Sequence, residues 1–339
     1  MIGFRQYFII ILISVPLVLA VFLEYKIFMI WPQITYLWQG NINPFLEFSD
    51  IGPHALRYTV IYPVLLLSEL LGVHYDIVFS YFVIIVYFCT CVFVSKTIKL
   101  YSFNESSFNY SVVFVALIIE ALMFLMNGRM TVSLLGYSIV IFYICKMHVH
   151  GQVNIQSLIA LILGFTLCGV SSGAIISALS LYLYYMITST YNLLSTGRFK
   201  SYLKNLVIIS LTFYIFIEIL ISMIDKNLNF YGGGFGGFLE MLNHGYGVIL
   251  YSLNGLQILL IAVSIFVFGL VYMMYYYTGR LSLLASMLII SICCGAFGYS
   301  TLAMAVIPAI LLITLTIHDL TLANYRIPTD YNRPGNRIA

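Results

Sequence analysis

Charged residues are scarce in this chain of 339 residues: Lys and Arg number 15, and Asp and Glu number 12, together 8% of the total. A soluble domain carries about 25% charged residues, so this chain lacks the polar surface that a soluble fold needs. Hydrophobic residues make up 62%, and the mean hydropathy is +1.02. The composition therefore excludes a soluble globular enzyme and predicts a membrane protein, for which no nucleic acid partner is expected.

Cysteines in metal-binding or disulfide patterns are also missing. None of the six has CxxC spacing, and all lie inside apolar runs: Cys89, Cys91, Cys145, Cys168, Cys293 and Cys294. Such cysteines are typical of small buried hydrophobic residues. We therefore expect neither a disulfide framework nor a metal-thiolate site, and the sequence indicates no cofactor.

Long apolar runs are what the chain does have. A membrane-spanning helix needs roughly 20 apolar residues, and such runs recur from residue 7 to residue 317. They predict an all-α, polytopic transmembrane helical bundle with about 10–11 spanning helices. We expect a single transmembrane domain over residues 1–317, followed by a cytoplasmic tail over residues 318–339.

The positive charges predict the orientation of the bundle. From residue 77 onward, ten lysines and arginines fall in alternate connections, whereas only Arg129 and Lys226 fall in the others. Lys and Arg are enriched in cytoplasmic connections, so both termini are predicted to be cytoplasmic, with outer loops over residues 31–76 and 225–255. The apolar run 58–73 contains Pro63 and Glu69, which favours a segment that does not span; an eleventh span there remains the alternative.

Two outer segments are polar enough to build a site. The first holds Trp31, Trp38, Glu47, Asp50, His54 and Arg57. The second holds Asp225, Lys226, Glu240 and His244 around a glycine-rich run from Gly232 to Gly237. The tryptophans are typical of an interfacial belt or of a wall for sugar stacking. The glycine-rich run indicates a flexible loop, a lid, or backbone N–H groups that approach an anion.

Arg129 is the most informative single residue. It lies between two apolar runs, at the end of the bundle that is predicted to face outward. An arginine near hydrocarbon is costly unless it reaches the interface, pairs with a carboxylate or binds an anion. Its guanidinium donates two parallel hydrogen bonds to phosphate oxygens, so a phosphate ligand is the functional interpretation. A snorkelling or Glu-paired arginine is the structural one.

Three further residues invite a functional interpretation. Glu120 and Glu218 lie deep inside apolar runs, where carboxylates are hydrogen-bonded, paired with arginine or part of a proton relay. Ser171 lies in a G-x-S-x-G sequence, but the nucleophile elbow of that pattern needs a strand-to-helix turn. We expect a tight turn between two helices there instead of a catalytic serine.

Three stretches resemble one family. They are YTVIYPVLLLSELLGVHYDIVFSYFVIIVYF, NGRMTVSLLGYSIVIFY and LILGFTLCGVSSGAIISALSLYLYY, which begin at Tyr58, Asn127 and Leu161. They are similar to the Wzy and EpsG group of bacterial polysaccharide polymerases, which build O-antigen or capsule from repeat units. The chain departs from that group at Gly169–Ser172, where a histidine is common.

The resemblance implies a metal-independent, inverting glycosyltransferase at the outer face of the bacterial inner membrane. It would move glycan from undecaprenyl pyrophosphate onto a lipid-linked repeat unit, with a chain-length regulator as an optional protein partner. Developing charge on the diphosphate needs stabilisation, for which Arg129, Arg57 and Lys226 are the candidates. The acceptor hydroxyl needs a general base; the candidates are His244, preferred for its place beside the glycine-rich run, and Asp50, Glu47 and Glu240.

Two other functions remain open. The first is a GT-C type glycosyltransferase that uses a polyprenyl-phosphate sugar, because such enzymes often keep acidic residues, here Glu47 and Asp50, in the first outer loop. The second is a transporter or flippase of lipid-linked oligosaccharide. Transporters commonly show repeated halves, and no repeat is visible in this sequence.

Overall fold

The chain folds as a bundle of helices. Its computed structural model describes residues 2–24, 28–51, 54–101, 105–150, 155–195, 199–243, 255–276, 280–295 and 303–325. Helices joined by turns make up this part of the chain, which contains no strand, so the prediction of an all-α bundle is confirmed. The helices are α1 (Phe4–Ile13), α2 (Val15–Glu24), α3 (Pro32–Gln39), α4 (Phe48–Ile51), α5 (Ala55–Leu71), α6 (Tyr75–Tyr101), α7 (Glu105–Leu125), α8 (Gly128–His150), α9 (Ile155–Cys168), α10 (Ser172–Ser195), α11 (Phe199–Phe230), α12 (Gly234–Asn243), α13 (Gly255–Tyr276), α14 (Arg280–Cys294) and α16 (Val306–Tyr325).

Several helices are long and apolar enough to cross a membrane. Over the described residues four qualify: α6, α7 over residues 108–125, α8, and α10 over residues 172–191. The α1–α2 pair qualifies as one bent span, and α9, α14 and α16 contain shorter apolar helices. The chain is therefore a multi-pass membrane protein. The larger number of spans stays a prediction, and the tail beyond residue 325 lies outside the described residues.

Helices α8 and α9 pack closely because glycines face each other between them. A Cβ on Gly136 would lie 2.6 Å from the carbonyl oxygen of Gly164 and from the backbone nitrogen of Cys168. Small residues let helix backbones approach in membranes, where apolar burial gives little net attraction between helices. This close contact fixes α8, and with it the position of Arg129 in the first turn of α8.

The first apolar run, which begins at residue 7, folds as a broken helix and not as one continuous helix. The axes of α1 and α2 differ by 41°, with the break at Ser14. Pro16 explains the break, because proline has no N–H and its ring clashes with the carbonyl four residues earlier. The break leaves the N–H of Leu17 without a helical partner, and the buried carboxylate of Glu120 accepts it at 3.1 Å. Glu120 thus provides the acceptor for this N–H, and within the described residues it forms no ion pair with an arginine.

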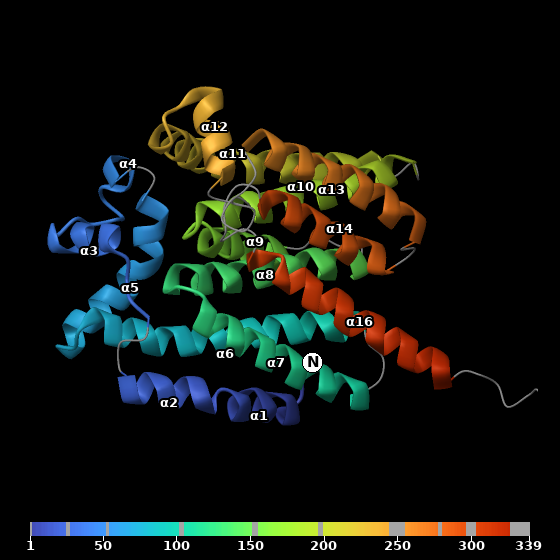
Figure 1. Cartoon of the computed structure of the whole chain (residues 1–339), viewed down its shortest axis with the longest axis horizontal. Coiled ribbons are helices and arrows are strands. Elements are labelled where there is room, and N and C mark those ends of the chain that lie inside the picture. Colours follow the sequence, from blue (N-terminus) through green and yellow to red (C-terminus); the bar gives the residue numbers. More distant parts are fainter. Residues whose placement is uncertain are drawn as a thin grey trace, which may run out of the picture.

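The two ends of the bundle carry different segments. Helices α6 and α8 begin at the same end, where α3, α4, α5 and α12 also lie (Figure 1). We call this the site end. The α1–α2 pair runs toward it, because Gln6 Nε2 donates to Asn109 near the start of α7 and the N–H of Ile30 donates to Asp76 near the start of α6. Residues 4–24 and 28–30 therefore lie on a single crossing of the bundle.

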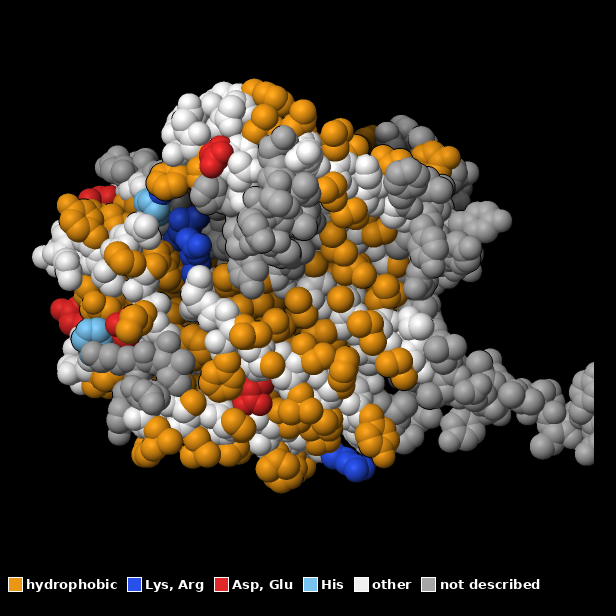
Figure 2. Space-filling model, in the orientation of Figure 1, with side chains coloured by type: hydrophobic (Ala, Val, Ile, Leu, Met, Phe, Trp, Pro, Cys, Tyr) orange, Lys and Arg blue, Asp and Glu red, His pale blue; other side chains and the backbone are white. Residues whose placement is uncertain are grey.

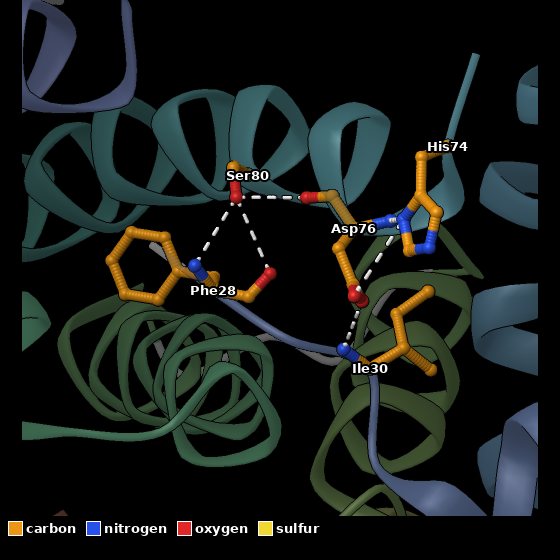
Figure 3. A network of polar contacts seen from close by, with 5 residues as sticks. All are labelled: Phe28, Ile30, His74, Asp76 and Ser80. Carbon is orange, nitrogen blue, oxygen red and sulfur yellow. Dashed lines mark hydrogen bonds and ion pairs between the residues drawn. The ribbon is translucent and has the colours of Figure 1, made fainter. Parts of the chain in front are cut away.

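A polar clasp closes the segment between residues 30 and 76, and consists of Phe28, Ile30, His74, Asp76 and Ser80 (Figure 3). Asp76 Oδ1 accepts the N–H of Ile30 at 2.8 Å, and Ser80 Oγ accepts the N–H of Phe28 at 3.1 Å. The N–H of Asp76 donates to His74 Nδ1 at 3.2 Å. Because the clasp joins both ends of the segment, residues 31–75 leave and return at the site end.

Helix α5 is the longest helix of this segment, and it does not cross the bundle. It has 17 residues with Pro63 inside, and it ends at Gly72, whose φ of 60° is left-handed. Tyr58, Ile61 and Leu65 are fully buried against the bundle. This geometry agrees with the non-spanning alternative for residues 58–73.

Candidate functional site

Two arginines occupy the first turns of two helices at the site end. Asn127 caps α8 by accepting the N–H of Met130 at 3.0 Å, which places Arg129 at the second helical position. His54 is the N-cap residue of α5, which places Arg57 at the third. Backbone N–H groups and the helix dipole give a helix N-terminus partial positive charge, which favours anions and disfavours cations. Both arginines therefore add charge where an anion, and not a cation, is stabilised.

The start of α5 is anchored by the turn between α9 and α10. A Cβ on Gly169 would lie 2.0 Å from Leu56 Cδ2, so glycine is needed for Leu56 to pack there. Ser171 is buried in the same turn, where its N–H donates to Cys168 and its carbonyl accepts from Ile175. The expected tight turn is thus present, and it positions the residues next to Leu56 in α5.

Four basic side chains meet at the site end, and we call them the cationic cluster: His54, Arg57, Arg129 and Lys226. Lys226, one turn before the end of α11, contacts His54 Nε2 through its Nζ. Arg57 is 8% exposed, whereas Arg129 and Lys226 are half-buried. Figure 2 shows Lys and Arg side chains gathered beside a histidine on this part of the surface. The three cations that the sequence singled out are thus neighbours in space.

Mutual repulsion in the cluster is visible in the pKa values. Burial, followed by the charges of Lys226, Arg57 and Arg129, lowers the pKa of His54 to about 4. Burial, followed by the charge of Arg129, lowers the pKa of Arg57 to about 10. Burial and then the two arginines lower the pKa of Lys226. The imidazole is therefore neutral at pH 7, and all three cations disfavour one another.

No carboxylate relieves this repulsion in the part of the chain that the structure describes. The contact between a basic and an acidic side chain found there joins His74 to Asp76, and none involves Arg57, Arg129 or Lys226. Within the cluster, Arg57 Nε and His54 Nδ1 are buried with no hydrogen-bond partner. Buried polar groups are nearly always satisfied, so unpaired donors among like charges indicate a site for an anionic ligand.

Among the general-base candidates, the structure describes the side chains of Glu47 and Glu240. Glu47 is half-buried, and its Oε1 accepts the N–H of Asn43 at 3.2 Å, a local contact before α4. Glu240 is exposed on α12, where its Oε2 accepts from Asn243 at 3.0 Å. His244 lies outside the described residues. Asp50 is in α4, but its side chain lies outside the described part, as does that of Glu218 in α11.

The glycine-rich run is a turn followed by a helix, and not a continuous flexible loop. Gly232, Gly233 and Gly234 have φ values of 95°, 74° and 58°, which only glycine adopts readily. Helix α12 then begins at Gly234 and buries Gly237 against the carbonyl of Leu228. Three left-handed residues reverse the chain directly after α11, and this leaves Lys226 at the site end.

The two tryptophans pack within the protein. Trp31 meets Phe79 edge to face at 6.4 Å between ring centroids, and Phe79 in turn lies against Gly128, the residue before Arg129. Trp38 meets Tyr62 at 5.7 Å. The aromatic side chains thus line the same end of the bundle as the cationic cluster, and both the interfacial belt and the sugar-stacking wall stay predictions.

His54 is the residue of the cluster that sequence reasoning did not place in the site. Its spacing from Arg57 was an available signal, because residues three apart share one face of a helix. Its contact with Lys226 joins positions 172 residues apart, which no local pattern indicates.

Comparisons with known proteins do not identify the chain. No family model, curated protein or solved structure matches its sequence or its fold.

Proposed function

We propose that the protein is a membrane-embedded glycosyltransferase that uses a polyprenyl-diphosphate-linked glycan, as the resemblance to the Wzy and EpsG polysaccharide polymerases implies. The observation that carries this proposal is the cationic cluster. Arg57, Arg129 and Lys226 converge from three helices with no described carboxylate between them. Two of them lie at helix N-termini, which are themselves anion sites.

The charge of the cluster is suited to a diphosphate. A glycan attached to a lipid through diphosphate carries two negative charges, and the released lipid diphosphate carries up to three. Charge therefore grows on the leaving group during transfer, and groups that stabilise growing charge lower the barrier. Three fixed cations and the N–H groups of two helices supply that stabilisation from the protein alone.

The location of the cluster suits a lipid-linked substrate. The cluster lies where the spanning helices α6 and α8 begin, at the site end, and Lys and Arg side chains are visible on the surface of this part of the molecule (Figure 2). A lipid in the surrounding bilayer holds its diphosphate at this depth, because its tail follows the apolar helix faces and its charged head lies at the interface. The bacterial inner membrane, the outer face and the O-antigen or capsule product are parts of the same proposal.

The proposed reaction also needs a general base. In an inverting transfer the acceptor hydroxyl loses its proton to a side chain while its oxygen attacks the anomeric carbon and the diphosphate leaves. Glu47 is already engaged with the backbone of Asn43. His244 and Asp50 therefore remain the first candidates for this role.

The charge count favours this function over a GT-C type enzyme. A polyprenyl-phosphate sugar, the donor of GT-C type enzymes, carries one negative charge and leaves two of the three cations unpaired. A flippase would bind the same diphosphate but form no glycosidic bond. Product analysis with purified protein separates these functions.

The experiment is polymerisation by the purified protein in liposomes that contain lipid-linked repeat units. We expect the wild type to form a ladder of glycan lengths and Arg129→Ala to leave only the single repeat. Lys146→Ala is the matched control, because Lys146 is a cation near the opposite end of α8 and lies over the ring of Tyr143; it should form the full ladder. A normal ladder from Arg129→Ala, or no polymer from the wild type, would overturn the proposal.

A further inference from the structure

The contact between His54 and Lys226 determines which ring nitrogen of His54 carries the proton. An ammonium group has donors and no acceptor. Nε2 of His54 therefore accepts from Lys226 Nζ, and in a neutral imidazole the proton is then on Nδ1. This Nδ1–H is buried and has no partner, as is the Nε–H of Arg57 three residues later. An unpaired buried donor destabilises the protein, and an anionic acceptor would remove that destabilisation.

The charges that face His54 come from several elements. Arg57 lies on α5 itself, Arg129 on α8 and Lys226 on α11, and all three repel the protonated imidazole. Among the elements packed against α5, α6 brings Asp76, which is already bound to Ile30. Helix α4 brings Asp50, whose side chain is not described, and α3 and α9 bring no charged residue.

We propose that His54 is a fourth ligand of the anion at the cationic cluster, and that its imidazole takes up one proton from solvent when the anion binds. The identity of this anion as a diphosphate rests on the proposed function. No covalent bond is made or broken in the protein apart from the new N–H at Nε2. Lys226 then turns from the ring to the anion, and both ring N–H groups become donors.

The physical basis is a reversal of the local potential. Without a ligand, burial and three cations hold the pKa of His54 at about 4, so the ring is neutral at pH 7. A diphosphate brings two or three negative charges into the same place. Opposite charge within about 4–6 Å favours the charged form of a histidine, so the bound anion raises the pKa of His54.

Binding and pH are therefore linked in one direction. Because the bound state holds one more proton, affinity rises as pH falls through the pKa of the bound state. The gain ends near pH 4, where the free protein also protonates. One proton limits the slope to about tenfold in affinity per pH unit.

Calorimetry of inorganic diphosphate binding to the full-length, detergent-solubilised protein tests the inference. The measurement is made at pH 7 in two buffers of different ionisation enthalpy, which gives the number of protons taken up. Diphosphate itself titrates near neutral pH, so the readout is the difference between proteins. We expect wild type to take up more protons than His54→Gln, by up to one per site.

The control is His74→Gln, which removes another histidine at the site end, one that is paired with Asp76 and not with the cluster. It should take up as many protons as wild type. Equal uptake by wild type and His54→Gln, or no binding of diphosphate by wild type, would overturn the inference. If His54→Gln fails to fold, His54→Asn serves instead, and it too should take up fewer protons than wild type.

A second titration, with a lipid diphosphate, distinguishes a lipid-linked diphosphate from a free one. Farnesyl diphosphate should bind more tightly than inorganic diphosphate, with a similar proton uptake, if the ligand is lipid-linked. Equal binding of both would assign a free diphosphate and contradict the lipid-linked source. Because these titrations contain no glycan, their outcome is independent of the polymerisation ladder that tests the proposed function.

Discussion

The polar clasp and the cationic cluster lie at the same end of the bundle, but they differ in whether their buried polar groups have hydrogen-bond partners. In the clasp, Asp76 accepts the N–H of Ile30, and Ser80 both accepts from and donates to the backbone of Phe28 (Figure 3). In the cluster, Arg57 Nε and His54 Nδ1 are buried without partners. The clasp satisfies its hydrogen bonds within the chain, whereas the cluster leaves its donors for another molecule.

The difference separates a structural role from a ligand-binding role. A buried polar group contributes to stability when it is paired and destabilises the fold when it is not. The clasp fixes where the segment of residues 31–75 begins and ends. The cluster places like charges together, a strained arrangement of the kind that persists at functional sites. Substitutions should therefore change stability in one region and ligand affinity in the other.

The largest effect is expected from Arg129→Gln on diphosphate affinity. Loss of a charge-assisted hydrogen bond weakens binding by about 1.5–3 kcal/mol, which is roughly 10–150-fold in affinity. The unfolding temperature should stay the same or rise, because one of three repelling cations is gone. Titration calorimetry and thermal unfolding measure the two quantities. A less stable protein with unchanged affinity would show that Arg129 is structural.

The next effect is expected from Asp76→Ala in the clasp. It removes the acceptor of the buried Ile30 N–H, so the free energy of unfolding should fall by about 1–3 kcal/mol. Asp76→Asn is the matched control, since its amide oxygen still accepts that N–H, and it should lose less. Denaturant unfolding of the solubilised protein gives both values. If neither variant loses stability, the clasp does not hold the segment.

A smaller effect is expected in the dependence of stability on pH. The pKa of His54 is about 4 in the folded protein and 6.5 in the unfolded chain. Between these values the unfolded chain binds the proton and the folded one does not, so stability falls as pH falls from 6.5 to 4. This contribution is constant above and below that window. Unfolding temperatures across this range should depend less on pH in His54→Gln; an identical pH profile would contradict this linkage.

The smallest effect is expected from Glu120→Gln. Its amide oxygen still accepts the N–H of Leu17 at the break between α1 and α2, so polymerisation and unfolding temperature should stay close to wild type. Glu120→Leu leaves that N–H unpaired and should lower the free energy of unfolding by about 1–3 kcal/mol. A strong loss of activity in the Gln variant alone would instead indicate a proton relay through Glu120.

Local signals in the sequence predicted much of this molecule. The apolar runs indicated spanning helices, and the isolated positions of Arg57, Arg129 and Lys226 singled them out as candidate anion ligands. A non-spanning segment over residues 58–73 was also predicted, from Pro63 and Glu69. The break after α1 was missed although Pro16 is the signal for it, because the hydropathy of the run continues unchanged across the proline.

These local patterns do not predict contacts between residues that are distant in the sequence. Glu120 was one buried carboxylate with several interpretations until the break at Ser14 left Leu17 N–H beside it. His54 had no assigned partner until the fold placed Lys226 beside it. In each case, the partner of the polar group decided its role, and that partner was set by the fold.

Scarcity of charge by itself determined that this chain is a membrane protein with helices, because an apolar chain can satisfy its backbone in lipid only through such regular hydrogen bonding. Only the tertiary structure decided that three of the few cations meet, and that His54 contacts Lys226, which is 172 residues away. Hydrophobicity is a property of each residue, so apolar segments can be recognised from the sequence alone. Electrostatic interaction depends on distance in space, which the packing of α5, α8 and α11 sets.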